Sequence, residues 1–226
     1  MPEAPIHLRP AAELAERVLL PGDPHRALHV AQVLLEKPLM FNHHRGLWGY
    51  TGTARDGAPL TVQATGMGGP SAAIVLADLA KLGVRRAIRV GTCTALAQEA
   101  EAGDLVLVHE ALAGGGSAEA YGVQRGMSVL PDPELFTRLR ESLGEDVRPV
   151  RIASLDAHPV GPVSAGDGAA AADLQTVTVL ARSRELGVAA AAVLIVSETG
   201  SGRLDDEALE SASTRAGIAA AAALST

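Results

Sequence analysis

The sequence predicts an α/β fold with one central mixed β-sheet and helices on both faces of that sheet. Short runs rich in branched aliphatic residues alternate with longer segments of helical periodicity along the 226 residues. This alternation is typical of βαβ units, which bury a sheet between two layers of helices. Because neither a long linker nor an internal repeat is visible, we expect a single domain over residues 1–226.

The segments with strand and helix patterns can be assigned along the chain. Three of the helical segments begin with proline, which favours the first turn of a helix. The expected strands are 17–20, 60–64, 87–90, 105–108, 147–153 and 191–196, and the expected helices are 24–36, 70–82, 133–143, 170–186 and 205–224.

The composition indicates a large aliphatic core and argues against polyanionic partners. Hydrophobic residues make up 47% of the chain and aromatic residues only 2%, so small and branched aliphatic side chains must fill the core. The formal net charge of −7 repels nucleic acid and anionic lipid, and no basic run offsets it. We therefore expect neither a nucleic acid nor a membrane as a partner.

Several features predict a cytoplasmic protein. Cys93 is the single cysteine, so no intramolecular disulfide can form. The first twenty residues carry charged side chains where a secretory signal needs an apolar stretch. The longest apolar runs, 188–196 and 216–224, are about half of the roughly 20 residues that span a bilayer.

The segment LPGDPHR, residues 20–26, joins an expected strand to an expected helix. Asp23 suits the N-cap and Pro24 the first helical position, while Gly22 lets a ligand approach the backbone. The free amides of the helix start attract an anion, and Arg26 adds a positive charge one turn later. A well-capped helix without a ligand explains the same residues.

Arg89 lies in the apolar run AIRVGT, residues 87–92. A buried cation is costly unless an anion or a carboxylate meets it. Thr92 could offer its hydroxyl to the same anion. Two explanations stay open: a bound anion, or an internal aspartate or glutamate that pairs with Arg89.

Two further segments exclude some chemistries. The glycine-rich turn TGMGGPS, residues 65–71, lacks the Lys-Ser/Thr of a P-loop and the full dinucleotide fingerprint, which argues against nucleoside triphosphates and NAD. The adjacent His43 and His44 have no further ligand at metal-binding spacing, so we expect no metal site.

Glu198 follows the most apolar expected strand, in the segment VSE at residues 196–198. Ligands of open α/β sheets bind outside the carboxyl ends of the strands, so a carboxyl group there could act as the general acid for a leaving base. A surface glutamate that caps the next turn is the alternative.

Taken in order, the segments PGDPHRA, HHRGLWGYTGT, TGMGGPS and RVGTC resemble the nucleoside phosphorylase-I family, which includes purine nucleoside phosphorylases and uridine phosphorylases. The resemblance covers about residues 6–104 and resumes more weakly from about residue 154. It implies an enzyme, a pentosyltransferase, that cleaves a nucleoside with inorganic phosphate as co-substrate and needs no other cofactor.

The resemblance also implies a phosphate site that two subunits share. The residues that match the family's phosphate positions are Gly22, Arg26, Arg45, Arg89 and Thr92. In the family, the residues that match Arg45 and His7 reach into the neighbouring subunit's site, so we expect a homodimer or a homohexamer. Because water-using relatives generally lack this arginine set, its retention favours phosphorolysis over hydrolysis.

The implied nucleoside contacts include three departures from the family. The residues that match sugar contacts are His7, Met67, Leu174 and Gln175, and those that match base contacts are His158, Ser197 and Glu198, with Glu198 and Arg89 as catalytic residues. Glu198 stands for an aspartate that protonates N7 of a departing purine, which favours purine nucleosides over uridine. His158 stands for a phenylalanine.

Gln175 is the largest departure, because it replaces a glutamate that binds the ribose 2′- and 3′-hydroxyls. A neutral amide stabilises an oxocarbenium-like transition state less than a carboxylate does. The preceding segment, 159–172, is also shorter than in typical members. These changes leave two alternatives: a weakly active or non-catalytic protein that binds nucleoside or phosphate, and an enzyme for a modified nucleoside.

Overall fold

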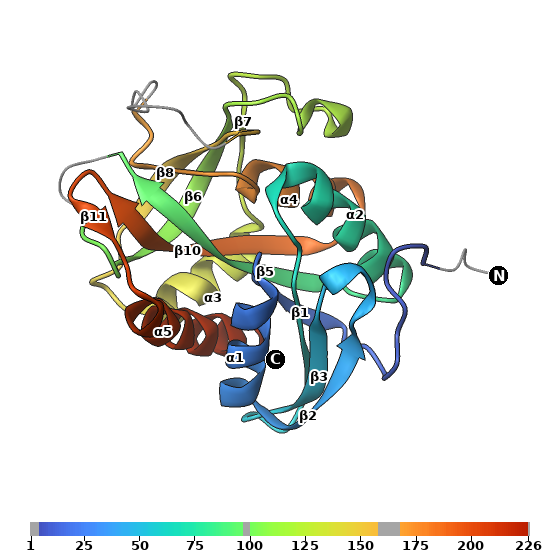
Figure 1. Ribbon diagram of the computed structural model, residues 1–226. Coiled ribbons are helices and arrows are strands. Elements are labelled where there is room, and N and C mark those ends of the chain that lie inside the picture. The colour runs from blue at the N-terminus through green and yellow to red at the C-terminus, as the bar shows by residue number, and fades with distance from the viewer. Residues whose placement is uncertain (1–4, 97–99, 158–167, 226) are drawn as a thin grey trace.

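The computed structural model describes residues 5–96, 100–157 and 168–225, and it confirms the predicted fold class. A mixed sheet of eleven strands lies between helices on both faces (Figure 1). The strands are β1 (Arg17–Leu20), β2 (Leu35–Asn42), β3 (Gly49–Ala54), β4 (Pro59–Gln63), β5 (Arg86–Ala95), β6 (Leu105–Ala113), β7 (Ser128–Val129), β8 (Pro149–Ser154), β9 (Ala171–Asp173), β10 (Ala189–Thr199) and β11 (Gly202–Arg203). The helices are α1 (Pro24–Leu34), α2 (Gly68–Lys81), α3 (Pro133–Leu143), α4 (Thr176–Glu185) and α5 (Asp206–Leu224).

The long strands β5 and β10 form the centre of the sheet. They run parallel from the pair Arg86 and Ala189 to the pair Thr94 and Glu198. From β5 the sheet continues through β1, β4 and β3 to β2, and from β10 it continues through β6 and β8 to β9. Because β9 pairs back with β5, the strands β5, β10, β6, β8 and β9 close into a ring.

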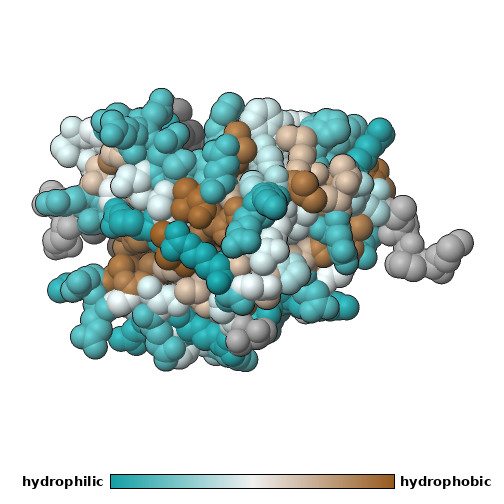
Figure 2. Space-filling view, turned by 90° about the horizontal axis from the view of Figure 1, so that it is seen from below, coloured by the Kyte–Doolittle hydropathy of each residue, from teal (hydrophilic) through white to brown (hydrophobic). Residues whose placement is uncertain are grey.

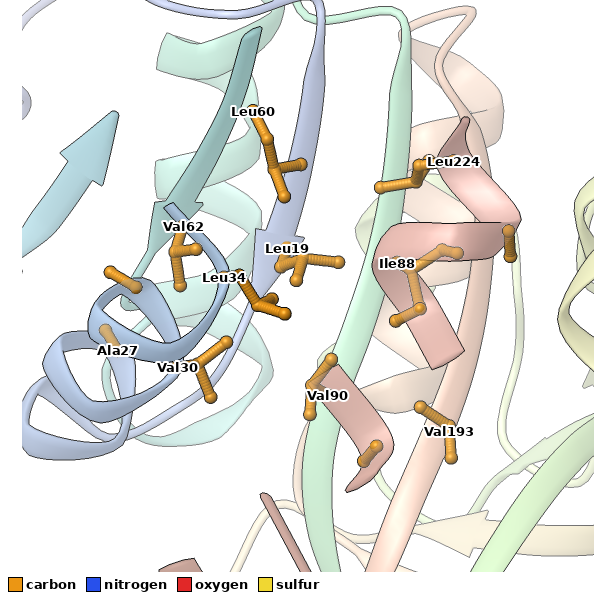
Figure 3. Close-up of a cluster of buried hydrophobic side chains, with 14 of the residues drawn as sticks. Leu19, Ala27, Val30, Leu34, Leu60, Val62, Ile88, Val90, Val193 and Leu224 are labelled. Atoms are coloured by element: carbon orange, nitrogen blue, oxygen red, sulfur yellow. The ribbon is translucent and has the colours of Figure 1, made fainter. Parts of the chain in front are cut away.

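Alternate residues of the central strands face opposite helix layers. Ala191, Val193 and Ile195 of β10 belong to the core cluster formed with α1, α3 and α5. Figure 3 shows part of this cluster, in which apolar side chains of β1, β4, β5 and β10 lie among those of α1 and α5. The intervening positions Leu194 and Val196 pack instead with α4. Because both faces of β10 are buried, its sequence is a continuous apolar run without alternating polar residues.

Five strands of the structure, β2, β3, β7, β9 and β11, were not anticipated from the sequence. The expected helix 24–36 ends at Leu34, and the chain continues directly into β2, which then pairs with β3. β2 lies at the edge of the sheet, where Pro38 needs no hydrogen-bonding partner for its nitrogen. Its largely exposed pattern hid it among loop residues, because edge strands owe their structure to pairing rather than to local propensity.

The expected helix 170–186 is also wrong at its start. Residues 171–173 form β9, which pairs with β5 and β8, and α4 begins only at Thr176. Alanine favours helices, but these alanines are buried in the strand ring, so tertiary packing overrides the propensity.

The surface on the side where α5 and β2 lie is mixed in polarity. Figure 2 shows apolar surface gathered between polar side chains on this side. Ile218 of α5 and Leu39 and Met40 of β2 are among the exposed large apolar residues. Among the helices that the structure describes, none has the length and hydropathy needed to cross a bilayer.

A buried arginine joins three parts of the chain at the start of β1, at the opposite end of this strand from Leu20. Arg17 of β1 donates to the two carboxylate oxygens of Asp56 at 2.5 and 2.6 Å and to the carbonyl oxygen of Pro59 at 2.7 Å. The hydroxyl of Ser225, after α5, donates to Asp56 at 2.6 Å. The hydrogen bonds from Arg17 hold the pKa of Asp56 well below its ordinary value of 3.8.

We expect this network to make stability fall in acid. Because the pKa of Asp56 is depressed in the folded state, its contribution is complete above about pH 5 and is lost as the pH falls through 3.8 towards the folded value. Asp56→Asn should therefore lower the free energy of unfolding by about 2 kcal/mol at neutral pH. The loss should be smaller at about pH 3. Urea unfolding at both pH values measures this, and equal losses would contradict it.

Candidate functional site

A cavity of about 570 Å³ opens beyond the carboxyl ends of the central strands. β1, β4, β5 and β10 run parallel to one another, so the segments that follow them meet at the same edge of the sheet. The sequence-predicted residues that line the cavity are Gly22, Arg26, Arg45, Met67, Arg89, Thr92, Leu174, Gln175, Ser197 and Glu198.

Two of the predicted site residues are not part of this lining. His7 does not line the cavity of its own chain, and its backbone N–H donates to the buried carboxylate of Asp78 at 2.7 Å. The N–H of Leu8 donates to the same carboxylate oxygen, so the N-terminal segment is fixed against α2. His158 lies outside the described residues.

Arg89 is 4% exposed, and its guanidinium meets a carboxylate of the same chain. Its Nη2 donates to Asp173 Oδ2 at 2.9 Å, and its Nη1 donates to the side-chain oxygen of Gln175 at 2.6 Å. Of the two explanations left open by the sequence, the internal carboxylate is therefore present. The pairing still leaves a second N–H on each of Nη1 and Nη2 without an acceptor among the described residues.

Residue 91 in the RVGTC segment must be a glycine because the Arg89 side chain lies close to its backbone. A Cβ atom on Gly91 would lie 2.6 Å from Arg89 Cζ and 2.7 Å from Leu194 Cδ2. Both distances are far too short, so the guanidinium can lie over the strand only if residue 91 has no side chain.

Asp173 is as firmly held as its partner. Its Oδ1 accepts from the hydroxyl of Ser154 at 2.5 Å, and its Oδ2 accepts from the hydroxyl of Thr176 at 2.6 Å. The backbone N–H of Thr176 also points to this carboxylate, so Asp173 links the end of β9 to the first turn of α4. Because Asp173 is fully buried, the ion pair cannot be exchanged for water.

Arg26 is a second cation in the same cavity, and it lacks such a partner. Its Nε and Nη1 atoms are buried without an acceptor in the described part of the chain. Burial, and then the nearby charge of Arg89, lower the pKa of Arg26 from 12.5 to about 10, and Asp23 offsets this only partly. A desolvated cation with unmet donors favours binding of an anion.

The residues around Arg26 fit that role. Asp23 caps α1 as the sequence predicted, because its carboxylate accepts from the backbone N–H of Arg26 at 2.8 Å. A Cβ atom on Gly22 would lie 3.7 Å from the Gln175 oxygen and 3.9 Å from Arg26 Nη2, so these three residues surround one small space.

The short 3-10 turn after β2 carries Arg45 to the rim of the cavity. Arg45 has a left-handed φ of 60°, which is uncommon for a residue other than glycine. Two buried amides hold the turn, because Asn42 Nδ2 and Gln63 Nε2 both donate to the carbonyl oxygen of Leu47, at 2.5 and 2.9 Å. Arg45 thus lines the cavity of its own chain, and its reach into a neighbouring subunit stays a prediction.

The cavity is also lined by residues that were not predicted from the sequence. Leu155 and Arg203 are two of them, and they line it together with Ser197 and Glu198 of β10. Arg203 lies in β11 directly opposite Glu198, and both residues line the cavity. The glycines and serine between these two residues, in the segment ETGSGR, are a hairpin signal that could have indicated this pairing.

Comparison with known proteins agrees with the resemblance seen in the motifs. Residues 16–226 match the phosphorylase superfamily. A DeoD-type purine nucleoside phosphorylase of Oceanobacillus iheyensis is 44% identical over 100 residues, which are 44% of this chain and 42% of that protein. Those of Geobacillus kaustophilus and Clostridium perfringens are 45% identical over 100 residues and 46% identical over 96 residues, covering 42% and 40% of their lengths. The chain therefore spans less than half the length of these relatives.

The unpaired guanidinium of Arg26 leads to a test that needs no substrate. In phosphate-free buffer, Arg26→Met removes a desolvated cation, so the melting temperature should not fall. Saturating phosphate should raise the melting temperature of the wild-type protein by about 5 °C and leave that of the variant unchanged.

Thermal unfolding at increasing phosphate concentrations measures both effects. Arg140→Met, at an exposed position of α3, is the matched control and should keep the full shift. A phosphate shift retained by Arg26→Met would show that the anion binds elsewhere.

Proposed function

This chain belongs to the phosphorylase superfamily, and from that premise we propose that it cleaves the N-glycosidic bond of a nucleoside with inorganic phosphate. The products are the free base and the sugar 1-phosphate. One observation carries the proposal: Arg26 is a buried cation with unmet hydrogen-bond donors, beside Arg89, in a cavity large enough for a small-molecule ligand.

The proposed phosphate site lies between the loop after β1 and the strand β5. Arg26, Arg45 and the free N–H groups of Arg89 hold the dianion, and Thr92 and the backbone at Gly22 complete the site. Because guanidinium groups bind oxyanions in fixed directions, one phosphate oxygen is left aimed at C1 of the sugar. That oxygen forms the new bond to C1 as the bond from C1 to the base nitrogen breaks.

Glu198 is proposed to protonate the departing base. The electron pair of the broken bond moves into the base, and a proton from the Glu198 carboxyl neutralises it. Arg203 lies opposite Glu198 and can orient the carboxyl group. A purine substrate is favoured over uridine, because a proton donor at this place suits a purine leaving group and the relatives are purine nucleoside phosphorylases by name. Ser197 and His158 complete the proposed base contacts.

The remaining parts of the proposal concern the working form of the protein. Inorganic phosphate is the co-substrate, and no other cofactor is required. We propose a homodimer or homohexamer with shared sites, supported by the anchoring of His7 against α2 without lining its own cavity. The composition and the single cysteine support a cytoplasmic location.

A second candidate is a protein that binds nucleoside or phosphate with little or no catalysis. The observation that favours it is the pairing of Arg89 with Asp173 and Gln175, which uses donors that could otherwise hold phosphate. An enzyme specialised for a modified nucleoside is a variant of the first proposal, suggested by the neutral Gln175.

Incubation with a panel of nucleosides, with and without phosphate, separates these candidates. Base release that requires phosphate is the expected result. Release without phosphate would indicate a hydrolase, and binding of nucleoside without any release would support the second candidate. If common nucleosides release no base but a modified nucleoside is cleaved, the specialised enzyme is supported.

The role of Glu198 has its own test. Glu198→Gln keeps the size of the side chain but removes the acidic proton, so turnover of a purine nucleoside should fall about 100-fold. An N7-methylated purine nucleoside carries a positive charge already and its base leaves without protonation, so its turnover should change little. Steady-state kinetics with both substrates measure the difference, and an equal loss for both would refute the acid role.

A further inference from the structure

The side chain of Gln175, which is 3% exposed, has no hydrogen-bonding capacity left for a ligand. Its oxygen accepts from Arg89 Nη1 at 2.6 Å and from the Thr65 hydroxyl at 3.0 Å, and the single proton of this hydroxyl is shared with the carbonyl oxygen of Pro21 at 3.2 Å. Its nitrogen donates to the carbonyl oxygens of Gly66 and Gly68 at 2.6 and 3.2 Å. A primary amide has two acceptor and two donor sites, so all four are occupied within the chain.

The neighbouring side chains at this part of the cavity offer no replacement. The carboxylate oxygens of Asp173 already accept hydrogen bonds from Arg89, Ser154 and Thr176, and its side chain is fully buried. Leu174 and Met67 are apolar, and Met67 is 90% exposed at the cavity wall. Among the described residues of this chain, the region between Met67 and Gln175 therefore offers no side-chain acceptor that a sugar hydroxyl could use.

Acceptors elsewhere in the cavity belong to its other parts. Thr92 and Thr94 lie on β5, and Ser197 and Glu198 lie on β10. The Ser197 hydroxyl itself donates to the carbonyl oxygen of Cys93 at 3.3 Å. Asp23 lies at the start of α1, where it accepts from the Arg26 N–H. None of these groups belongs to the Met67, Leu174 and Gln175 wall.

The bonds of Gln175 also show why the residue is an amide. A glutamate in the same position would set a carboxylate oxygen 2.6 Å from the carbonyl oxygen of Gly66, where two acceptors repel each other. The amide instead holds the Gly66 turn, whose φ of +75° suits glycine. Gln175 thus serves the structure of the cavity wall rather than a free hydroxyl.

From these contacts we infer that the sugar taken by this cavity is a 2′-deoxyribose. This inference rests on the proposed function, in which the sugar lies against Met67, Leu174 and Gln175. A 2′-hydroxyl buried there would lose its water without gaining an acceptor, whereas a CH₂ group loses nothing. Discrimination by an unmet hydrogen bond of this kind amounts to about tenfold to hundredfold.

The chemistry of bond cleavage acts in the same direction. Positive charge develops on C1 as the base leaves, and an electronegative 2′-oxygen opposes it. A carboxylate near the sugar would offset that effect, but Gln175 is neutral. A 2′-deoxy sugar carries no such oxygen, so it reaches the transition state without the missing charge. The bonds that form and break are the same as for a ribonucleoside: a phosphate oxygen bonds to C1, the base leaves with the electron pair, and Glu198 supplies the proton.

The test compares matched nucleosides in the presence of excess phosphate. Adenosine, guanosine, inosine and uridine are each paired with the 2′-deoxy form, and kcat/KM is measured for both members. We expect the 2′-deoxy member to be at least about tenfold better, for whichever base is cleaved. Equal values or a preference for ribose would overturn this inference and leave the proposed function standing. Absence of phosphorolysis for every pair would overturn the proposed function and the inference with it.

A variant tests the part played by Gln175. Gln175→Glu should move the deoxy-to-ribo ratio towards ribose by about tenfold, because a carboxylate can accept from the 2′-hydroxyl and offset charge at C1. The ratio is taken within one protein sample, so a lower folded fraction cancels. Gln124→Glu makes the same change at an exposed amide outside the cavity lining, and it should leave the ratio unchanged. An unchanged ratio in Gln175→Glu would contradict the placement of the sugar. If that variant does not fold, the comparison of ribo and 2′-deoxy substrates with the wild-type protein alone tests the inference.

Discussion

The buried ion pair between Arg89 and Asp173 is the interaction on which the rest of the site depends. β5 carries Arg89 into an aliphatic core, where an unpaired charge would be strongly destabilising. β9 supplies the carboxylate, and it can do so only by pairing with both β5 and β8, which closes the strand ring. The same arrangement sets the start of α4 and brings Leu174 and Gln175 to the cavity. The position of the residues proposed to contact the sugar thus follows from the need to neutralise one cation.

Arg26 and Arg89 differ in a way that explains the electrostatics of the cavity. Arg89 has an internal carboxylate, but Arg26 feels only the repulsion of Arg89 and the weaker attraction of Asp23. The pair of arginines therefore retains an excess positive charge, in a protein whose formal net charge is −7. Because the excess is desolvated, an anion gains more from it than it would from an exposed lysine or arginine. A small anion that reaches this point meets a local field opposite to that of the whole molecule.

Local signals explain what could be predicted from the sequence and what could not. α1 and α3 begin where Asp23-Pro24 and Asp132-Pro133 indicate, because N-caps act within one turn. β2, β3 and β9 were missed because their stability comes from pairing with distant strands. For the site, the motifs identified most of the cavity-lining residues, because most of them lie near the carboxyl end of a parallel strand. The partner of Arg89 could not be identified, because Asp173 lies 84 residues away and was expected inside a helix.

The two halves of the chain contribute different parts of the cavity, and this bears on how the protein relates to its family. The residues proposed for phosphate come from the strands and turns before residue 93, where the motifs of the family are clear. The residues proposed for sugar and base come mainly from the sequence after residue 154, where the resemblance is weaker and Gln175, His158 and Glu198 depart from the family pattern. The attack of phosphate is common to every substrate of such an enzyme, whereas contacts with sugar and base decide which nucleoside is used. A site with these arginines and a changed sugar wall is therefore expected to keep the attack of phosphate and to differ from its relatives in the nucleoside that it accepts.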